Sequence, residues 1–255
     1  MEEFESWQSY SNFEQAVKHH SRYIRPPDIE AFLQTVLKTA QSRIQVLAKD
    51  KFLWRAQLGH DLINGGEEVG EVPAPHPPKR MCPRSGRAKE GRANPRGISC
   101  LYLASNRDTA MAEVRPWIGS HVSVSQFKTL KDLRIVNCTS DMKGIVFYFE
   151  EPSPKDREEA VWAEIDRAFS RPVTASDDVD DYVPTQIVAE LFRANGFDGV
   201  GYRSSLGKGY NVVFFDIGVA EPINGFLFEL SGIDFNFIET SNPYFLTTHY
   251  RKTEE

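Results

Sequence analysis

Cysteine is scarce in this chain of 255 residues. Its three cysteines, Cys82, Cys100 and Cys138, are widely separated. They form no CxxC pair, and no histidine lies near them at the spacing of zinc ligands. A small, odd set of this kind argues against a disulfide framework and a structural zinc site, and it is typical of a reducing compartment. We therefore expect a cytoplasmic protein without a structural metal.

Long apolar segments are also missing. The longest apolar runs, GIVFYF at 144–149 and VVFF at 212–215, are far shorter than the roughly 20 residues that span a bilayer. The first residues, MEEFESWQ, are acidic and lack a signal-peptide pattern. Both features predict a cytoplasmic protein with no membrane partner.

Positive charge is in short supply overall, but it is concentrated in one segment. The 30 basic and 36 acidic residues give a net charge of −6, which argues against direct nucleic-acid binding through a broad basic surface. Residues 79–96 nevertheless contain one acid, Glu90, and seven bases: Lys79, Arg80, Arg84, Arg87, Lys89, Arg92 and Arg96. Such a segment either binds phosphates or is a solvated loop, and the sequence leaves both open.

Several common catalytic motifs are absent. The sequence contains no GxxxxGK[ST], no GxGxxG after a strand, no GxSxG and no HExxH. The six histidines form no metal-binding pattern, and the acidic run DDVDD at 177–181 lacks the ligand spacing of a calcium loop. We expect this run to be solvated and the protein to use no metal.

Apolar periodicity predicts a mixture of helices and strands. The helix predicted over 28–47 has Asp28 as its N-cap, helical structure is also expected in residues 1–25, and 64–97 has the composition of a loop. Strands are predicted at 52–59, 99–105, 121–127, 133–139 and 210–217, and further helices at 108–115, 155–169 and 187–193. Because strands and helices do not alternate strictly, the pattern favours an α+β fold.

The most informative stretch is GRANPRGISCLYLASNRDTAMAEVRPW at 91–117, which reads as a loop, a strand and a helix. It would bring Arg92, Tyr102 and Glu113 towards one cleft. An arginine suits a phosphate, a tyrosine can stack on a flat ring, and a glutamate can stabilise positive charge developing at an anomeric carbon. The alternatives are a turn-capping arginine, a core tyrosine and an exposed helical acid.

Two more segments offer suitable side chains. Arg55 in LWRAQLG would supply a second arginine for a pyrophosphate, and Ser204 or Ser205 in YRSSLGKG stands where a strand passes into a loop. Spacing alone does not show that these residues share a pocket with the stretch at 91–117.

These segments together closely resemble the RES domain family over roughly residues 50–217. The resemblance implies an ADP-ribosyltransferase-like split mixed sheet flanked by helices, with an N-terminal helical extension at 1–49, a RES domain at 50–255 and a tail at 218–255. Carried over by motif, the GRxN arginine is Arg92, the strand tyrosine is Tyr102 and the helix glutamate is Glu113. The YxS serine is Ser204, with Ser205 as the alternative, and the earlier arginine is Arg55. This chain has Ala93 where family members often have tryptophan.

The family resemblance implies an enzyme that consumes NAD+ and is commonly the toxin of a bacterial toxin–antitoxin pair. The enzyme would cleave the nicotinamide N-glycosidic bond without a metal, with water or inorganic phosphate as acceptor, and an antitoxin would be its partner. Transfer of ADP-ribose to a macromolecule and a non-catalytic interaction role are the alternatives. A homo-oligomer stays open.

Overall fold

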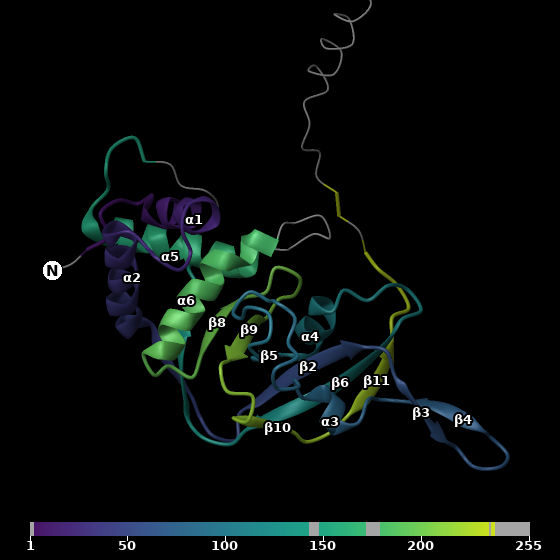
Figure 1. The fold of residues 1–255 in the computed structure, drawn as a ribbon. Helices are drawn as coiled ribbons and strands as arrows, with labels where there is room; N and C mark the ends of the chain where they lie inside the picture. The colour runs from purple at the N-terminus through teal and green to yellow at the C-terminus, as the bar shows by residue number, and fades with distance from the viewer. Residues whose placement is uncertain (1–2, 143–147, 172–178, 235, 238–255) are drawn as a thin grey trace, which may run out of the picture.

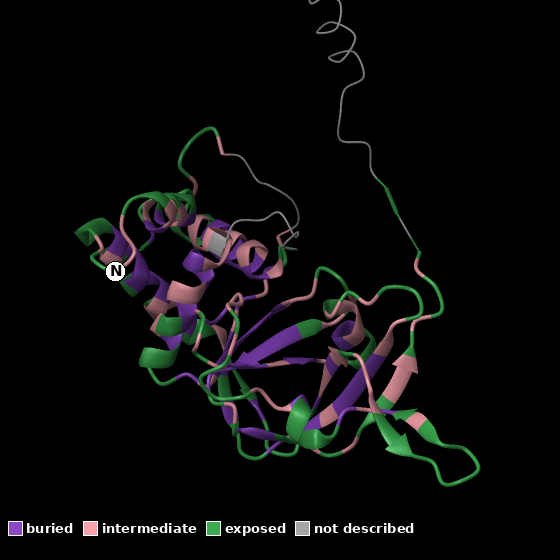
Figure 2. Ribbon diagram, turned by 45° about the vertical axis from the view of Figure 1, so that its right-hand side comes forward, coloured by how far each residue is buried: buried purple, intermediate pink, exposed green. Residues whose placement is uncertain are grey.

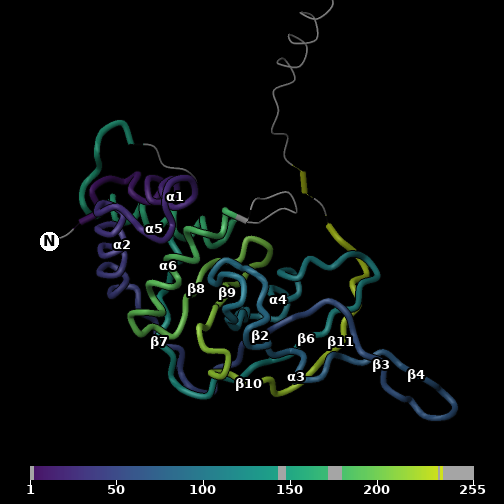
Figure 3. The backbone as a smooth tube through the Cα atoms, viewed as in Figure 1, coloured from purple at the N-terminus to yellow at the C-terminus, as the bar shows by residue number. Residues whose placement is uncertain are grey.

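The computed structural model describes residues 3–142, 148–171, 179–234 and 236–237. Figure 1 shows one large β-sheet with a group of helices packed at one end of it. In the tube of Figure 3, the first helices of the chain lie beside helices that come from residues far later in the sequence. The predicted α+β class, a mixed sheet flanked by helices with further helices at the N-terminus, is confirmed.

The main sheet has nine strands in the order β1-β7-β8-β9-β5-β2-β6-β10, and β11 also pairs with β6. Among the described strands, β7 and β8 form the parallel pair of this sheet, and the other pairs are antiparallel. Their bounds are β1 (Ile44–Leu47), β2 (Phe52–Leu58), β5 (Leu101–Ala104), β6 (His121–Thr129), β7 (Leu133–Asn137), β8 (Gly199–Arg203), β9 (Tyr210–Phe214), β10 (Ala220–Pro222) and β11 (Phe226–Glu229).

The sheet is divided at its middle. Strands β2 and β5 are joined by a single register pair, Trp54 with Ala104, whereas β2 pairs with β6 over its whole length. Because β2 and β5 pair at this one position, their backbones separate beyond it and a gap opens between the two halves of the sheet. This split, between β1-β7-β8-β9-β5 and β2-β6-β10-β11, is the feature that positions the candidate site.

The helices cover different parts of the sheet. A group of four packs together against the half that contains β8, namely α1 (Ser9–His19), α2 (Pro27–Thr39), α5 (Pro154–Ser170) and α6 (Val183–Ala194). Helix α4 (Arg107–Glu113) instead packs on β2, β5 and β6, close to the split, and the short α3 (Pro78–Met81) contacts β2. The 3-10 turns are η1 (Ala40–Arg43) and η2 (Val179–Tyr182).

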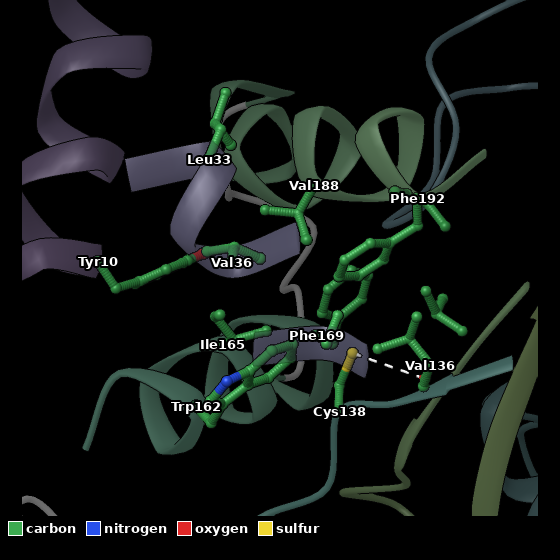
Figure 4. Packing of buried hydrophobic residues seen from close by; sticks show 14 of the residues in the cluster. Tyr10, Leu33, Val36, Val136, Cys138, Trp162, Ile165, Phe169, Val188 and Phe192 are labelled. Carbon is green, nitrogen blue, oxygen red and sulfur yellow. Dashed lines mark hydrogen bonds between the residues drawn. The ribbon is translucent and has the colours of Figure 1, made fainter. Parts of the chain in front are cut away.

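The largest core lies between the four helices and the sheet. Figure 4 shows Trp162, Phe169 and Phe192 packed together, and all three are fully buried. Burying each large aromatic side chain contributes about 1.5–3 kcal/mol. Strand residues of the opposite sheet face, such as Leu101 and Phe214, belong to a second cluster. The purple strands of Figure 2 show that both faces of the central strands are covered.

The predicted helix at 28–47 is wrong in its second half. Helix α2 begins at Pro27, with Pro26 rather than Asp28 at the N-cap, and it ends at Thr39. Ile44–Leu47 then form β1, because the backbone of this segment pairs with β7 at the edge of the sheet. Ile44 and Leu47 pack in the clusters on opposite faces of the sheet, although their spacing of three residues is also typical of one face of a helix.

The prediction that 64–97 is only a loop is also wrong. Strands β3 (Asp61–Asn64) and β4 (Glu71–Ala74) form a hairpin, and α3 follows it. The hairpin stands away from the main sheet in Figure 1 and is largely exposed in Figure 2. Its short strands pair with each other rather than with the core, so they carry no strong burial pattern.

Three other expectations need comment. Residues 220–222 and 226–229, expected within a C-terminal tail, pair with β6. In the acidic run at 177–181, residues 177 and 178 lie outside the described residues. Asp180 and Asp181 form ion pairs with Arg22 and Lys18, while their side chains stay 40% and 29% exposed. Residues 144–147 of the run GIVFYF also lie outside the described residues. Among the described residues, no helix is long and apolar enough to cross a bilayer.

Candidate active site

A cleft of about 310 Å³ opens at the split in the sheet. One wall comes from β2 and the other from β5, β8, β9 and α4, so segments from residue 54 to residue 211 meet here. The cleft is lined by Trp54, Arg55, Ala56, Tyr102, Leu103, Ala104, Ala110, Glu113, Val114, Tyr202 and Asn211. Its size and its mixture of apolar, aromatic and a few polar groups are typical of a small-molecule site.

Glu113 is the last residue of α4. The helix is short because Arg115, two residues later, adopts a left-handed φ of 47°. At its other end, the Asn106 side chain caps the helix by accepting a hydrogen bond from the backbone N–H of Thr109 at 2.8 Å. Ala110 packs into the cluster that includes Ala56 and Ala104, which fixes α4 against the split.

Two donors hold the Glu113 carboxylate. Ser204 Oγ and Asn211 Nδ2 each donate to Glu113 Oε1 at 2.7 Å. Ser204 Oγ in turn accepts from the backbone N–H of Gly207 at 3.0 Å, which fixes the hydroxyl. The two donors occupy one carboxylate oxygen, and among the described residues none donates a hydrogen bond to the other, Oε2. The carboxylate is therefore oriented while one of its oxygens stays available.

The loop that carries Ser204 lies directly on the first turn of α4. The backbone N–H of Gly209 donates to Thr109 Oγ1 at 3.1 Å. A Cβ on Gly209 would come within 2.5 Å of Ser105 Oγ and 2.6 Å of Thr109 Oγ1, and one on Gly207 would come within 2.7 Å of Thr109 Oγ1. The glycines in SLGKG thus let the backbone approach α4 closely enough for Ser204 to reach Glu113.

Tyr102 lies on β5 at the centre of the cleft. Its hydroxyl donates to Asn94 Oδ1 at 2.7 Å and accepts from the backbone N–H of Ala93 at 3.0 Å. Burial is the main reason why the pKa of the Tyr102 phenol is raised well above its usual value. Tyr102 is therefore a neutral side chain that ties the GRANP loop to the sheet and lines the cleft at the same time.

Arg55 bridges the split. Its Nη1 donates to the backbone carbonyl of Tyr102 across the gap at 3.2 Å, and its Nε is buried without a hydrogen-bond partner in the described structure. Burial lowers the pKa of the Arg55 guanidinium. A buried cation with an unused donor is costly unless an anion or another acceptor completes its shell.

Arg92 and Ser205 are placed differently from the other predicted site residues. Arg92 is not among the residues that line the cleft; its Nη1 donates to the carbonyl of Ala168 at 2.9 Å, and its guanidinium lies 5.8 Å from the ring centroid of Tyr182. Ser205 is exposed, and Ser204 is the serine that bonds to Glu113. The structure thus brings Arg55, Tyr102, Glu113 and Ser204 together.

Two residues of the site were not singled out from the sequence. Asn211 is 7% exposed and contacts Glu113, and Tyr202 lines the cleft beside it. Burial, reinforced by the charge of Glu113, raises the pKa of the Tyr202 phenol. Both residues could have been found by their position in the sequence. Tyr202 begins the YxS motif, and Asn211 is a polar residue near the start of β9, followed by the apolar residues Val212–Phe214. Among the described residues, no group of three or more His, Cys, Asp and Glu side chains could hold a metal.

Comparison with known proteins bears on this site. The model of the family described as RES domain matches residues 69–225, which include Arg92, Tyr102, Glu113 and Ser204 but not Arg55. A solved structure, the M. tuberculosis MbcT-MbcA toxin-antitoxin complex, contains a chain that is 15% identical, with a TM-score of 0.43, over 76% of this chain and 92% of that one. No curated protein matches the chain.

Proposed function

Since the chain belongs to the RES domain family, we propose that it is an enzyme that consumes NAD+ by cleaving the nicotinamide N-glycosidic bond. The nicotinamide of NAD+ is already cationic, so it leaves as a neutral molecule and needs no general acid. The barrier lies in the positive charge that develops on the ribose. The group needed at that position is a fixed negative charge.

The observation that carries the proposal is the geometry of Glu113. Its Oε1 is held by Ser204 and Asn211 at 2.7 Å, and its carboxylate lines the cleft. A carboxylate oriented before the substrate arrives needs little reorganisation in the transition state, which is how preorganised charges stabilise it. Glu113 would stabilise the ribosyl cation or accept a hydrogen bond from a ribose hydroxyl.

The other lining residues have separate roles in this proposal. Tyr102 packs on the nicotinamide or its ribose, since its ring lines the cleft and its hydroxyl is already paired. Arg55, whose side chain lines the cleft and whose Nε has no partner in the described structure, binds a phosphate of the dinucleotide through its guanidinium. Arg92 acts by holding the GRANP loop against α5, and Ser204 orients Glu113. Ser205 has no assigned contact, and we favour Ser204 as the motif serine.

The acceptor decides the product. Attack by water gives nicotinamide, ADP-ribose and a proton, whereas attack by inorganic phosphate gives nicotinamide and ADP-ribose-1″-phosphate. To test the reaction, purified protein is incubated with NAD+, with and without inorganic phosphate, and the products are separated by mass. The Glu113→Gln variant serves as the inactive control, and Glu67→Gln, an exposed acid at the hairpin tip, is the matched active control.

Each result has a distinct meaning. Equimolar nicotinamide and ADP-ribose indicates hydrolysis, and a phosphorylated product that appears only with phosphate indicates phosphorolysis. ADP-ribose attached to protein or nucleic acid would favour the transferase alternative instead. Unchanged NAD+ with either acceptor would contradict the proposed function and favour an interaction role.

In the cell, we propose that this activity makes the protein a toxin of the cytoplasm controlled by a cognate antitoxin, as the family resemblance implies. Unregulated loss of NAD+ stops growth, so an enzyme of this kind needs an inhibitor. Inducing the wild-type chain in a bacterial host should deplete NAD+ and arrest growth, whereas Glu113→Gln at equal abundance should do neither. Arrest by both proteins would show that toxicity does not depend on the proposed chemistry.

A further inference from the structure

A second cavity of about 480 Å³ adjoins the cleft. We name it the basic pocket, and it is lined by Arg55, Gln57, Cys82, Pro83, Arg84, Arg87, Ala88, Lys89, Asn94, Cys100 and Tyr102. Arg55 and Tyr102 line both cavities, so the basic pocket lies directly beside the cleft. A ligand longer than the cleft can therefore extend past these two side chains.

The backbone of the loop around the basic pocket is held in place. The carbonyl of Arg84 accepts from Ser99 Oγ at 2.8 Å, that of Ala88 from the backbone N–H of Gly97 at 2.9 Å, and that of Lys89 from Asn94 Nδ2 at 3.0 Å. Asn94 is itself tied to the Tyr102 hydroxyl. The loop is therefore built onto the same framework as the cleft.

Unlike the backbone of this loop, which is hydrogen-bonded, its basic side chains form no ion pairs with the described carboxylates. Arg84, Arg87 and Lys89 are exposed, and no described carboxylate forms an ion pair with any of them. The single acid of the segment, Glu90, is not among the residues that line the pocket. With Arg55, whose Nε lacks a partner, four cations border one cavity whose lining contains no acid. Such a concentration of like charge favours an anionic ligand.

We propose that the basic pocket is a phosphate-binding subsite, in which Arg84, Arg87 and Lys89 complete the coordination that Arg55 begins. The planar forks of arginine match phosphate oxygens, and several mobile cations on a fixed loop can close around a tetrahedral anion. The phosphate comes either from the pyrophosphate of the dinucleotide or from free inorganic phosphate. This assignment of the source rests on the proposed function, whereas the anion site itself does not.

This subsite also explains a discrepancy between sequence and structure. Motif position suggests Arg92 as a phosphate ligand, but Arg92 is engaged by the Ala168 carbonyl and the Tyr182 ring, and it lines neither cavity. The cations of residues 84–89 stand next to the cleft instead. They belong to the basic segment whose role the sequence left open.

The test is direct binding without turnover. Isothermal titration of the full-length protein with inorganic pyrophosphate, and separately with inorganic phosphate, compares wild type with the double variant Arg84→Gln/Arg87→Gln. Arg96→Gln is the matched control, because Arg96 is an exposed cation of the same segment that does not line the pocket. Each charged hydrogen bond lost weakens binding about tenfold. We therefore expect the double variant to lose at least that factor and Arg96→Gln to bind as wild type.

Competition with ADP-ribose identifies the source. If ADP-ribose displaces pyrophosphate, the pocket takes the phosphates of the dinucleotide; if inorganic phosphate binds together with ADP-ribose, it takes the acceptor. The proposal is overturned if wild type binds neither anion, or if the double variant binds them as tightly as Arg96→Gln does. Should the double variant melt at a lower temperature than wild type, Lys89→Gln replaces it under the same criteria. Anion binding by a protein that leaves NAD+ intact would refute the proposed function and keep the subsite.

Discussion

The two walls of the cleft are organised in opposite ways. On the wall from α4, β8 and β9, the Glu113 carboxylate is held by two donors at 2.7 Å, and one of them, Ser204, is itself fixed by a bond from the backbone N–H of Gly207. On the β2 wall, Arg55 has a buried donor without a partner, and in the basic pocket that adjoins this wall Arg84, Arg87 and Lys89 have no ion pairs among the described residues. The first wall orients its charged group without a ligand, whereas the second has hydrogen-bond donors and cations that lack partners among the described residues.

This difference assigns catalysis to the wall that carries Glu113 and substrate binding to the wall that carries Arg55. A charge that is already oriented suits the transition state, because it needs no rearrangement as the bond breaks. Donors that lack partners gain most when a ligand supplies acceptors, so they contribute to substrate affinity. Changes on the α4 wall should therefore lower kcat, and changes on the β2 wall should raise KM.

The largest effect is expected from Glu113→Gln. The amide keeps the shape of the side chain, and its oxygen can still accept from Ser204 and Asn211, but the negative charge is lost. Removing one preorganised electrostatic contact lowers kcat by about 10²–10³. The measurement is the initial rate of nicotinamide release at saturating NAD+, with Glu67→Gln as control.

The donors behind Glu113 should have the next largest effect. Ser204→Ala and Asn211→Ala each remove one hydrogen bond to the carboxylate, and each should lower kcat by about tenfold. Because both donors hold the same oxygen, the double variant should lose less than the product of the two single losses. Fully multiplicative losses would show that the two residues act independently, contrary to this account.

Arg55→Gln tests the opposite wall. Losing the guanidinium removes its charge and the donor available to a phosphate, so KM for NAD+ should rise about tenfold with a small change in kcat. Arg92→Gln is the comparison, since Arg92 is engaged by the protein and should alter KM less. A loss confined to kcat in Arg55→Gln would mean that the β2 wall also acts on the transition state. Because Arg55 also bridges β2 and β5, the melting temperature of each variant is measured to exclude loss of folding as the cause of a kinetic change.

The last prediction concerns stability rather than rate. Burial raises the pKa of the Cys100 thiol from 9.0 to about 11, so the unfolded chain loses this proton at lower pH than the folded protein does. The stabilisation is complete below pH 9 and is lost as pH rises to about 11. Over this interval the free energy of unfolding should fall more steeply in wild type than in Cys100→Ala, by up to about 1.4 kcal/mol per pH unit. Equal slopes in urea titrations would show that Cys100 is not held in a dry environment.

Much of the sheet was predictable, because its strands carry apolar or alternating patterns. Residues 52–59, 121–127 and 133–139 follow β2, β6 and β7 closely, and the helix predicted at 108–115 overlaps α4. Strand β1 was missed because edge pairing with β7, and not its side-chain spacing, selects its conformation. The β3–β4 hairpin was missed because few of its residues are buried and proline and glycine dominate its surroundings.

The site was predictable only in part. Glu113 and Ser204 are 91 residues apart in sequence, and motif resemblance rather than periodicity joined them. Asn211 was overlooked because nothing in the sequence near this residue identifies Glu113, 98 residues away, as the acceptor of its side-chain hydrogen bond. Arg92 shows the converse: its residue type suited a phosphate, but the packing of the GRANP loop against α5 gives its guanidinium a protein acceptor.

The most direct test of the division between the walls is the kinetic comparison of Glu113→Gln with Arg55→Gln. NAD+ binding to each purified variant is measured by calorimetry, and nicotinamide release is measured at saturating NAD+. We predict that Glu113→Gln binds NAD+ with nearly wild-type affinity and releases nicotinamide about 10²–10³ times more slowly, whereas Arg55→Gln binds about tenfold more weakly and turns over at close to the wild-type rate. Wild-type turnover by Glu113→Gln would contradict the account.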